Sequence, residues 1–329
     1  MIRRLSFSIL IAALSLLCGE TTARAQTDAW IDTDPAIGLI GRDADDGFAL
    51  VQALRSPQIR IRGVSTTWGN ASGPETFAIA CEIAALFGGD GGLNEAMVFA
   101  GANAAADLGQ PTAATTALAA ALRERRLTYI AIGPLTNLAT LLQREPALRE
   151  RVDRVVFLGG HRPGEHFRIG RWNPYVIHDA NFEKDSAAAA IILGAGIPLT
   201  FVPIGATLDC TITPADLAAI GRSGPGGAWL QQRARLWLRL MRWIFGVEGG
   251  PLFDSVAVLA VTNPELLQIA RCVPRLDPAS KPPRLVLEPA SEAGVARVVT
   301  GTRPGAKTLI LRRLEGATTE ISSASPSAK

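Results

Sequence analysis

Five aspartates lie within fifteen consecutive positions near the beginning of the chain: Asp32, Asp34, Asp43, Asp45 and Asp46. Carboxylates held this close repel one another, and the repulsion raises their pKa values unless a cation or several N–H donors neutralise the charge. Oxygen ligands suit calcium or magnesium better than zinc. The three histidines of the chain are not spaced as a zinc site. The cluster therefore predicts a binding site for a hard divalent cation.

A structural role is the first alternative for these aspartates, which could cap a helix beginning near Gly47 and form turns at Gly38 and Gly41. An EF-hand loop beginning at Asp32 is excluded, because its sixth position requires glycine and holds Ile37. A phosphatase with an aspartyl nucleophile would use the "DTD" segment but would leave the following Asp-Asp pair without a role. Five carboxylates after one strand favour the metal site over both.

Strand and helix patterns alternate along the chain around the aspartates. Runs rich in β-branched residues predict strands, and stretches rich in alanine and leucine predict helices. The strands are expected at 29–32, 59–68, 127–133, 152–160 and 197–205, and the helices at 47–55, 74–88, 115–125, 135–144 and 185–196. This order predicts an α/β protein with a single doubly wound, mostly parallel sheet and helices on both faces. Ligands of such sheets bind beyond the carboxyl ends of the strands, where the aspartates, "TTWGN" and "IGPLTN" would meet.

The first 25 residues have the pattern of a secretory signal peptide. Two arginines precede a continuous apolar stretch from Leu5 to Leu17, and Ala23-Arg24-Ala25 is a small-x-small cleavage pattern. The apolar stretch is shorter than the roughly 20 residues that a membrane-spanning helix needs, which disfavours an anchor. We therefore expect an exported protein, most plausibly periplasmic, that has no membrane association after cleavage.

The remaining chain has the composition of one globular domain, expected over residues 26–314 and followed by a mobile polar tail over 315–329. A net charge of +3 without a basic stripe argues against nucleic acid as a partner. Residues 221–250 contain a helix that carries Trp229, Trp237 and Trp243 among arginines. Packing beside the sheet is favoured for this helix over binding at a membrane surface.

A set of segments in this chain resembles one enzyme family. The segments "DTDP", "DDGFAL", "TTWGN", "IGPLTNLATLL", "VVFLGG", "DANFEKDSAAA" and "LFDSVAV" occur in the order found in nucleoside hydrolases of the inosine-uridine type, over about residues 29 to 260. The resemblance implies a single α/β domain with a tightly bound calcium ion. It also implies a small-molecule nucleoside substrate, whose N-glycosidic bond is hydrolysed to ribose and free base, and a homo-oligomer, either a dimer or a tetramer.

The resemblance also assigns metal ligands. Asp34, Asp46 and Asp254 match carboxylate ligands of calcium, and the backbone carbonyl of Ile132 matches the main-chain ligand. Asp34 is also the expected base that deprotonates the attacking water. Asp32 resembles a residue that supports the ligands without contacting the metal. Bound calcium would fix the water and the ribose hydroxyls together, and the carboxylates would favour the positive charge that glycosidic cleavage develops.

Further residues are expected to bind the nucleoside. The predicted sugar contacts are Asp45, Asn70, Asn173, Asp179 (where glutamate is usual) and Asn181, and the candidate walls around the base are Trp68, Trp172 and Phe253. In the pyrimidine-accepting branch of the family, a histidine stands at the position of Phe253. Phenylalanine cannot donate a proton, whereas a purine can be protonated at a ring nitrogen. We therefore predict a preference for purine nucleosides; one of the histidines at 161, 166 and 178 is the alternative proton donor.

The metal loop departs from the family pattern. Nine residues separate Pro35 from Asp45, where the family has two, so the loop is seven residues longer. Its glycines could let it bulge outward and return Asp45 and Asp46 to the usual place, or Asp43 could replace one of them as a ligand. A second function also remains open: a non-catalytic protein that binds calcium and the ribose of nucleosides. Retention of both Asp34 and Asp254 favours the enzyme.

Overall fold

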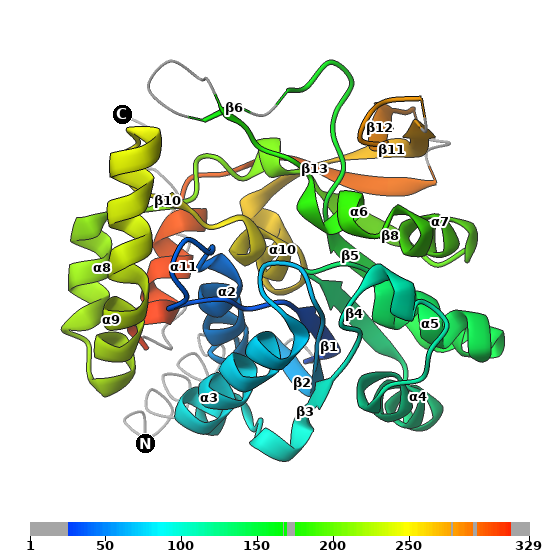
Figure 1. The fold of residues 1–329 in the computed structure, drawn as a ribbon, viewed down its shortest axis with the longest axis horizontal. Coiled ribbons are helices and arrows are strands. Elements are labelled where there is room, and N and C mark those ends of the chain that lie inside the picture. Colours follow the sequence, from blue (N-terminus) through cyan, green and yellow to red (C-terminus); the bar gives the residue numbers. More distant parts are fainter. Residues whose placement is uncertain (1–25, 167, 170–174, 278, 292–294, 317–329) are drawn as a thin grey trace, which may run out of the picture.

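The computed structural model describes residues 26–166, 168–169, 175–277, 279–291 and 295–316. Nine strands of this part form one sheet (Figure 1), in the order β12 (Arg284–Pro289), β11 (Leu267–Asp277), β13 (Ala296–Thr302), β8 (Leu199–Val202), β5 (Val152–Leu158), β4 (Leu127–Ala131), β1 (Thr27–Thr33), β2 (Ile59–Thr66) and β3 (Val98–Ala100). The strands from β13 to β3 run parallel, whereas β11 pairs antiparallel with β13 and β12. The predicted α/β fold class is therefore confirmed.

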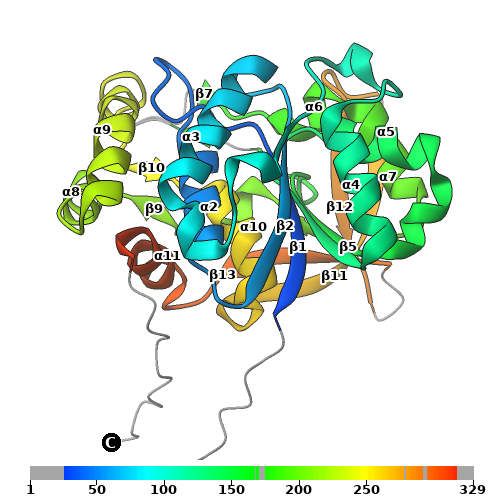
Figure 2. The same cartoon turned by 90° about the horizontal axis from the view of Figure 1, so that it is seen from below.

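Helices cover both faces of the sheet (Figures 1 and 2), as the sequence predicts. The core on one face contains α2 (Asp45–Leu54), α3 (Gly73–Gly91), α10 (Phe253–Thr262) and α11 (Ala306–Glu315), with α8 (Pro214–Gly221) and α9 (Pro225–Leu240) packed on the outer side of these helices, and the core on the other face contains α4 (Ala113–Glu124), α5 (Thr136–Arg144) and α7 (Ser186–Gly194). Along β1, Ala29 and Ile31 enter the first core and Trp30 enters the second. The sheet is thus buried on both sides, and ligands can reach its strands only at an end.

Short elements complete the described chain. They are the helix α6 (Ala180–Lys184), the antiparallel strand pairs β6 (Arg168–Ile169) with β7 (Tyr175–Val176) and β9 (Thr211–Ile212) with β10 (Gly250–Pro251), the short 3-10 helices at Glu95–Met97, Ala105–Asp107, Pro146–Arg151, Ile204–Ala206 and Pro264–Leu266, and a π-helical turn at Met241–Phe245. The π-helical turn continues α9. Because Tyr175 in β7 packs edge-on against Phe245 with ring centroids 5.0 Å apart, this turn is held beside the β6–β7 strand pair.

The five predicted strands and five predicted helices are all present, with ends that differ by a few residues. Four strands of the sheet, β3, β11, β12 and β13, were not predicted. Most residues of β11 are exposed or half-buried, and its sequence mixes arginines and a proline with apolar residues. An antiparallel edge region with one solvated face lacks the continuous apolar run that marks a buried parallel strand. The signal used for the five central strands is therefore absent there.

The tryptophan-rich segment was expected to form a helix packed beside the sheet; it forms α9, which packs instead on the helices α2 and α3. The Trp229 ring lies 5.7 Å from the Phe87 ring and the Trp237 ring 6.3 Å from the Phe48 ring, measured between centroids. Trp243, in the π-helical turn, is 71% exposed. In the described part of the chain, every helix is too short or too polar to cross a membrane.

Both predicted terminal segments fall largely outside the described residues. This applies to the whole signal peptide, residues 1–25, and to residues 317–329 of the tail. Glu315 is the last residue of α11, and Gly316, with a φ angle of 86°, ends the helix in the left-handed conformation that glycine favours. The folded domain therefore extends at least to residue 316, slightly beyond the expected boundary at 314.

Candidate active site

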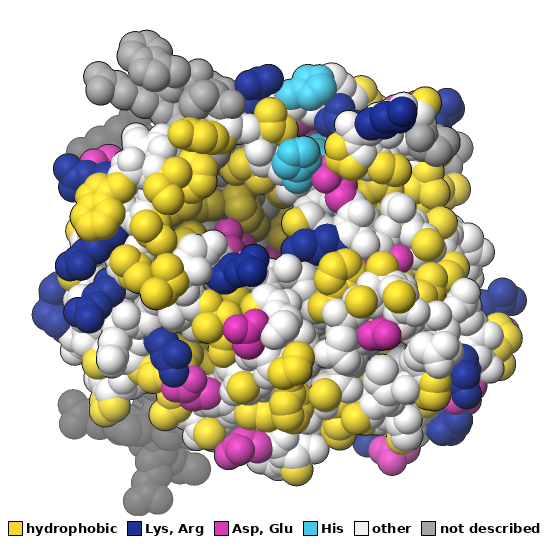
Figure 3. All heavy atoms as spheres, viewed as in Figure 1, with side chains coloured by type: hydrophobic (Ala, Val, Ile, Leu, Met, Phe, Trp, Pro, Cys, Tyr) yellow, Lys and Arg dark blue, Asp and Glu magenta, His cyan; other side chains and the backbone are white. Residues whose placement is uncertain are grey.

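A pocket opens at the carboxyl ends of the parallel strands, as expected for this sheet. Figure 3 shows it as a hollow with acidic side chains at its base and hydrophobic side chains at its rim. Its lining residues come from the ends of β1, β4 and β5, from the beginnings of α2, α6 and α10, and from the loops between them: Asp34, Asp43, Asp45, Asp46, Asn70, Ile132, Leu158, Ile177, His178, Asp179, Ala180, Asn181, Lys184, Ile204, Phe253 and Asp254. The fold therefore gathers segments from most of the chain at one place.

Three buried carboxylates meet in this pocket. Asp45 and Asp46 form the first turn of α2, Asp254 lies in the first turn of α10, and each offers a carboxylate oxygen within 4.8 Å of the others. The beginnings of both helices carry a partial positive charge that favours carboxylates there. Asp254 Oδ1 is nevertheless buried without a hydrogen-bond partner among the described residues. A buried, unpaired carboxylate oxygen facing two further carboxylates fits a divalent cation.

The pKa values of these carboxyl groups reflect their crowding. Burial raises the pKa of Asp254 well above its usual range, and the charges of Asp45 and Asp46 raise it further. Burial likewise raises the pKa of Asp45, with the charge of Asp43 as the next contribution. The pKa of Asp46 is also raised by burial, although the Thr33 hydroxyl lowers it in part. Without a cation, the protein would hold this group of acids together at a cost in stability.

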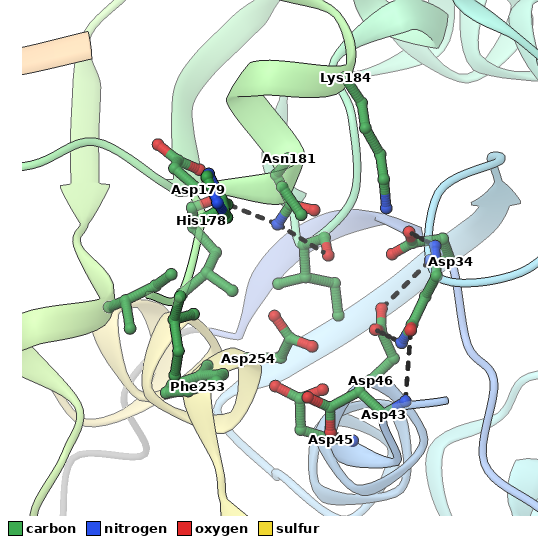
Figure 4. Close-up of a pocket in the computed structure, with 16 residues that line it drawn as sticks. Asp34, Asp43, Asp45, Asp46, His178, Asp179, Asn181, Lys184, Phe253 and Asp254 are labelled. Carbon is green, nitrogen blue, oxygen red and sulfur yellow. Dashed lines mark hydrogen bonds between the residues drawn. The ribbon is translucent and has the colours of Figure 1, made fainter. Parts of the chain in front are cut away.

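Asp34 lies beside the three carboxylates without belonging to that group (Figure 4). Its backbone N–H donates a 3.1 Å hydrogen bond to Asp46 Oδ1, which also accepts one of 2.6 Å from the Thr33 hydroxyl. Burial and then the charge of Asp46 raise the pKa of Asp34, whereas the charge of Lys184 lowers it. The predicted ligands Asp34, Asp46 and Asp254 are therefore neighbours. Asp45, predicted as a sugar contact, also belongs to the group, with a carboxylate oxygen within 4.8 Å of those of Asp46 and Asp254.

The lengthened loop returns Asp45 and Asp46 to the pocket. Gly38 and Gly41 have φ angles of 95° and 72°, a conformation that other residues rarely adopt, and α2 begins directly after the loop at Asp45. Asp43 also lines the pocket, but its Oδ1 accepts hydrogen bonds from the backbone N–H groups of Ala44 and Asp45, at 2.7 and 3.4 Å. The geometry thus matches the outward bulge, with Asp43 bound to the beginning of the helix.

Helix α6 brings the remaining predicted sugar contacts into the pocket. Asn181 Nδ2 donates to the carbonyl oxygens of Ile132 and Leu158, at 3.3 and 3.2 Å, so the predicted backbone ligand faces this amide. Asp179 lines the pocket but also caps α6, since its carboxylate accepts hydrogen bonds from the N–H groups of Gly160 and Phe182, at 2.6 and 3.3 Å. Burial raises the pKa of Asp179 to about 6. Its carboxylate is therefore engaged with the backbone before any sugar arrives.

Asp32 lies behind the pocket, in agreement with a supporting role. It is fully buried, its Oδ1 accepts hydrogen bonds from the Ser65 hydroxyl and from Asn137 Nδ2, and burial raises its pKa to about 6. Asn137 lies in α5, and its Oδ1 also accepts from the backbone of Ala102. Through these contacts Asp32 ties the end of β1 to β2 and α5. Asp34, two residues further along, projects from a rigid support.

One of the three aromatic residues proposed to surround the base is found in the lining of the pocket. Phe253 lines the pocket together with Ile177 and Ile204. Trp68 is not among the pocket-lining residues in the described part of the chain, so its predicted role as a wall is not supported by this geometry. Trp172 and the predicted sugar contact Asn173 lie outside the described residues.

Two further residues line the pocket: His178, one of the three histidines considered as a proton donor, and Lys184, which had no predicted role. His178 lines the pocket next to Asp179, with its Nδ1 atom 3.1 Å from Glu183 Oε2. Lys184 lines it as well, and its position three residues after Asn181 is the one signal that could have revealed it, because residues three apart share a face of a helix. The other two histidines are not part of the described lining. Burial lowers the pKa of His161 to about 4, so it is neutral at pH 7.

Comparison with known proteins identifies relatives of the whole domain. The family model for inosine-uridine preferring nucleoside hydrolases matches residues 29–302. The chain is 29% identical over 272 residues to uridine nucleosidase 1 of Arabidopsis thaliana, covering 75% of this chain and 77% of that protein. It is also 29% identical over 270 residues to the pyrimidine-specific ribonucleoside hydrolase RihA of Photobacterium profundum, covering 74% of this chain and 82% of that protein.

Solved structures share the fold. A plant nucleoside hydrolase matches with a TM-score of 0.72 at 24% identity, over 88% of this chain and 99% of that one. A purine-preferring ribonucleoside hydrolase from Gardnerella vaginalis matches with a TM-score of 0.73 at 20% identity, over 89% of this chain and 99% of that one. The resemblance seen in the sequence is confirmed, because the family model spans nearly the entire described domain. The chain belongs to the family of inosine-uridine preferring nucleoside hydrolases.

Proposed function

We propose that this protein is a calcium-dependent enzyme that hydrolyses the N-glycosidic bond of ribonucleosides to ribose and free base, with purine nucleosides preferred. The observation that carries the proposal is the group formed by Asp45, Asp46 and Asp254, with Asp34 beside it in the pocket. Family membership supports the hydrolytic activity. The metal and the preferred base are inferred from the residues of the pocket.

Calcium is the metal that the donor set fits best. Asp34, Asp46, Asp254 and the carbonyl of Ile132 are the proposed ligands, and the close approach of Asp45 makes it a further candidate. All these donors are oxygens, which hard cations prefer, and no cysteine or histidine stands among the three carboxylates. When bound, calcium would supply a water of lowered pKa and a fixed place for the ribose hydroxyls.

The protein's own groups then act on the water and the sugar. Asp34 serves as the base that takes the proton of the attacking water, and its orientation is set by the hydrogen bond from the Asn70 N–H to its Oδ2. As the glycosidic bond breaks, positive charge develops on the ribosyl group, and the surrounding carboxylates stabilise it. Asn70 and Asn181 line the pocket, and in this proposal they bind sugar hydroxyls. Catalysis thus depends on positioning and on negative charge.

The preferred base follows from the apolar side of the pocket. Phe253, Ile177 and Ile204 offer surfaces on which a base can lie, but none of them can protonate it. A purine base is protonated at a ring nitrogen, which lets it depart without a nearby acid. A nitrophenol leaving group needs no proton at all. Both should therefore leave more readily from this pocket than uracil.

Uridine hydrolysis is the second candidate. His178 lines the pocket and could supply the proton that Phe253 cannot. The names of the two curated relatives also refer to uridine or pyrimidine substrates. In this alternative the acid comes from the segment before α6 rather than from the beginning of α10.

Steady-state kinetics separates the two candidates. We expect kcat/KM of the wild-type protein to be higher for inosine and for nitrophenyl riboside than for uridine, and Phe253→His to raise the value for uridine. If the wild-type protein cleaves uridine as well as inosine, and His178→Ala removes only the uridine activity, the purine preference is wrong and His178 is the acid. If the protein binds ribose but releases none from any nucleoside, the result would instead support the non-catalytic binding protein.

We further propose that the protein is exported to the periplasm after removal of residues 1–25. This rests on the arrangement of arginines, apolar residues and small residues in that segment. Expression of the full chain followed by N-terminal sequencing of the secreted form should give Gln26 as the first residue. A cytoplasmic protein that retains Met1 would overturn this proposal.

A further inference from the structure

Lys184 places a positive charge in a pocket built from carboxylates. It is the only lysine or arginine among the described residues that line the pocket, which include six aspartates. Lys184 ends α6 and lies three residues after Asn181, so both side chains project from the same face of this helix. Figure 4 shows the ammonium group of Lys184 directed toward Asp34.

The ammonium group of Lys184 has no direct partner in the described part of the chain. It makes no ion pair with an N–O distance of 4.0 Å or less there, although Asp34 faces it. Lys184 is only half-buried, so water can still reach it. A gap of more than 4 Å between an ammonium nitrogen and a carboxylate oxygen has room for one oxygen atom, because two consecutive hydrogen bonds span up to about 5.6 Å. Such an oxygen would accept from Lys184 and donate to Asp34.

A hydroxyl group has the chemistry to fill this gap, since it accepts one hydrogen bond and donates another. Phe253 and Lys184 lie on opposite sides of Asp254 in Figure 4, so a base stacked on Phe253 would lie away from the ammonium group. Asn181, a predicted sugar contact, lies on the same face of α6 as Lys184. The sugar is thus the part of a nucleoside nearest to Lys184.

We propose that Lys184 is a substrate-binding residue that donates a hydrogen bond to a ribose hydroxyl held between its ammonium group and Asp34. The inference rests on the proposed function, because it takes the sugar of a nucleoside as the ligand of this pocket. It adds a specificity-determining contact: the enzyme selects a ribosyl group over a deoxyribosyl group through a lysine on α6.

Deoxynucleosides test this contact directly. The kcat/KM values of wild type, Lys184→Met and the control Lys281→Met are measured at saturating calcium for inosine, 2′-deoxyinosine and 3′-deoxyinosine. Lys281 is exposed and lies outside the pocket lining, so its substitution removes the same charge elsewhere. Lys184→Met should lower the value for inosine by about 10- to 100-fold, as expected for a hydrogen bond to a charged group. The deoxynucleoside that lacks the contacted hydroxyl should lose less than about twofold.

The pattern across the three substrates decides the outcome. Equal losses for all of them would show that Lys184 acts on Asp34 or on the metal site and would overturn the proposal. A loss that is present at limiting calcium and disappears at saturating calcium would do the same, because it would reflect metal affinity. Lys184→Arg retains a charged hydrogen-bond donor. It should therefore recover part of the inosine activity that Lys184→Met loses.

Calorimetric titration of ribose and 2-deoxyribose into the calcium-loaded proteins provides a readout that does not depend on catalysis. Lys184→Met should weaken ribose binding, with no comparable effect for Lys281→Met. If the wild type hydrolyses no nucleoside, the proposed function fails, yet this titration still decides the role of Lys184. Unchanged ribose binding in Lys184→Met would overturn the inference even if the protein proves to be an active hydrolase.

Discussion

The carboxylate of Asp34 lies against the backbone of Asn70, whose N–H donates a hydrogen bond of 2.5 Å to Asp34 Oδ2. Gly69, which directly precedes Asn70 after the end of β2, makes this close approach possible. A Cβ atom at position 69 would lie 2.0 Å from Asp34 Oδ2, and the φ angle of Gly69 is 150°, a conformation that other residues seldom adopt. The glycine of "TTWGN" therefore allows the proposed base to approach the backbone after β2.

Gly69→Ala should displace the Asp34 carboxylate and lower kcat/KM by at least about tenfold, since even a 1 Å misplacement of a catalytic group can cost about 100-fold. Gly89→Ala is the matched control, because a Cβ atom there meets nothing within 4 Å and Gly89 lies inside α3. Steady-state kinetics with inosine measures the effect. Activity of Gly69→Ala equal to that of the control would show that the position of Asp34 is not critical.

Removal of metal should lower both activity and thermal stability, because Asp45, Asp46 and Asp254 would then repel one another. A ligand present at 100 times its Kd stabilises the folded state by about 2.7 kcal/mol, so a strong chelator should lower Tm measurably, and added calcium should restore it. Differential scanning calorimetry and elemental analysis check this. Full activity of a protein shown to be free of metal would contradict the prediction.

Asp254→Asn provides a second test of the same repulsion. In the presence of chelator this variant should melt at a higher temperature than the wild type, because it lacks one charge of the group and keeps a similar shape. Added calcium should raise its Tm much less than that of the wild type. If the variant is less stable than the wild type without metal, the aspartates are not mutually destabilising in the folded protein.

In the lengthened loop, substitutions of Asp43 and of Asp46 are expected to have different effects on calcium binding. Asp46→Ala should abolish calcium binding, because Asp46 belongs to the group of three carboxylates. Asp43→Ala should retain most of it, because Asp43 Oδ1 is hydrogen-bonded to backbone N–H groups at the beginning of α2. Isothermal titration of the metal-free variants with calcium measures both affinities. The opposite ranking would show that the longer loop has made Asp43 a ligand.

Because the carboxyl group of Asp179 is buried, we expect the free energy of unfolding to depend on pH. Its pKa rises from 3.8 to about 6 in the folded protein because of burial, so the folded state binds the proton more tightly than the unfolded state between these values. Unfolding free energy must therefore fall as pH rises through this range, by about 3 kcal/mol for this group. The loss is complete above the folded-state pKa and absent below the unfolded-state pKa.

Asp179→Asn should remove this contribution, since the amide carries no charge, although its single oxygen can accept from only one of the N–H groups of Gly160 and Phe182. Urea unfolding of wild type and variant, each at about pH 4 and about pH 7, gives the difference. The variant should lose less stability than the wild type between the two pH values. Equal losses would mean that Asp179 is ionised without penalty in the folded state.

The sequence alone determined the central strands, the helices between them and the acidic character of the site. β1, β2, β4, β5 and β8 are recognisable because a parallel strand covered on both faces must be apolar throughout. The carboxyl ends of such strands lie on one edge, so the grouping of Asp34, Asn70 and Ile132 could be predicted as well. These features depend on local composition and on a general rule of topology. The exposed antiparallel strands β11 and β12 follow no such rule and were missed.

The tertiary structure decided which side chains meet. Asp254 reaches Asp45 and Asp46 only because α10 and α2 pack with their first turns side by side, a contact between distant segments that no local pattern encodes. Two further features have the same origin: the hydrogen bonds of Asp43 and Asp179 to backbone N–H groups, and the entry of Lys184 into the pocket. Side-chain direction depends on the angle at which elements pack, and that angle is fixed by contacts throughout the fold.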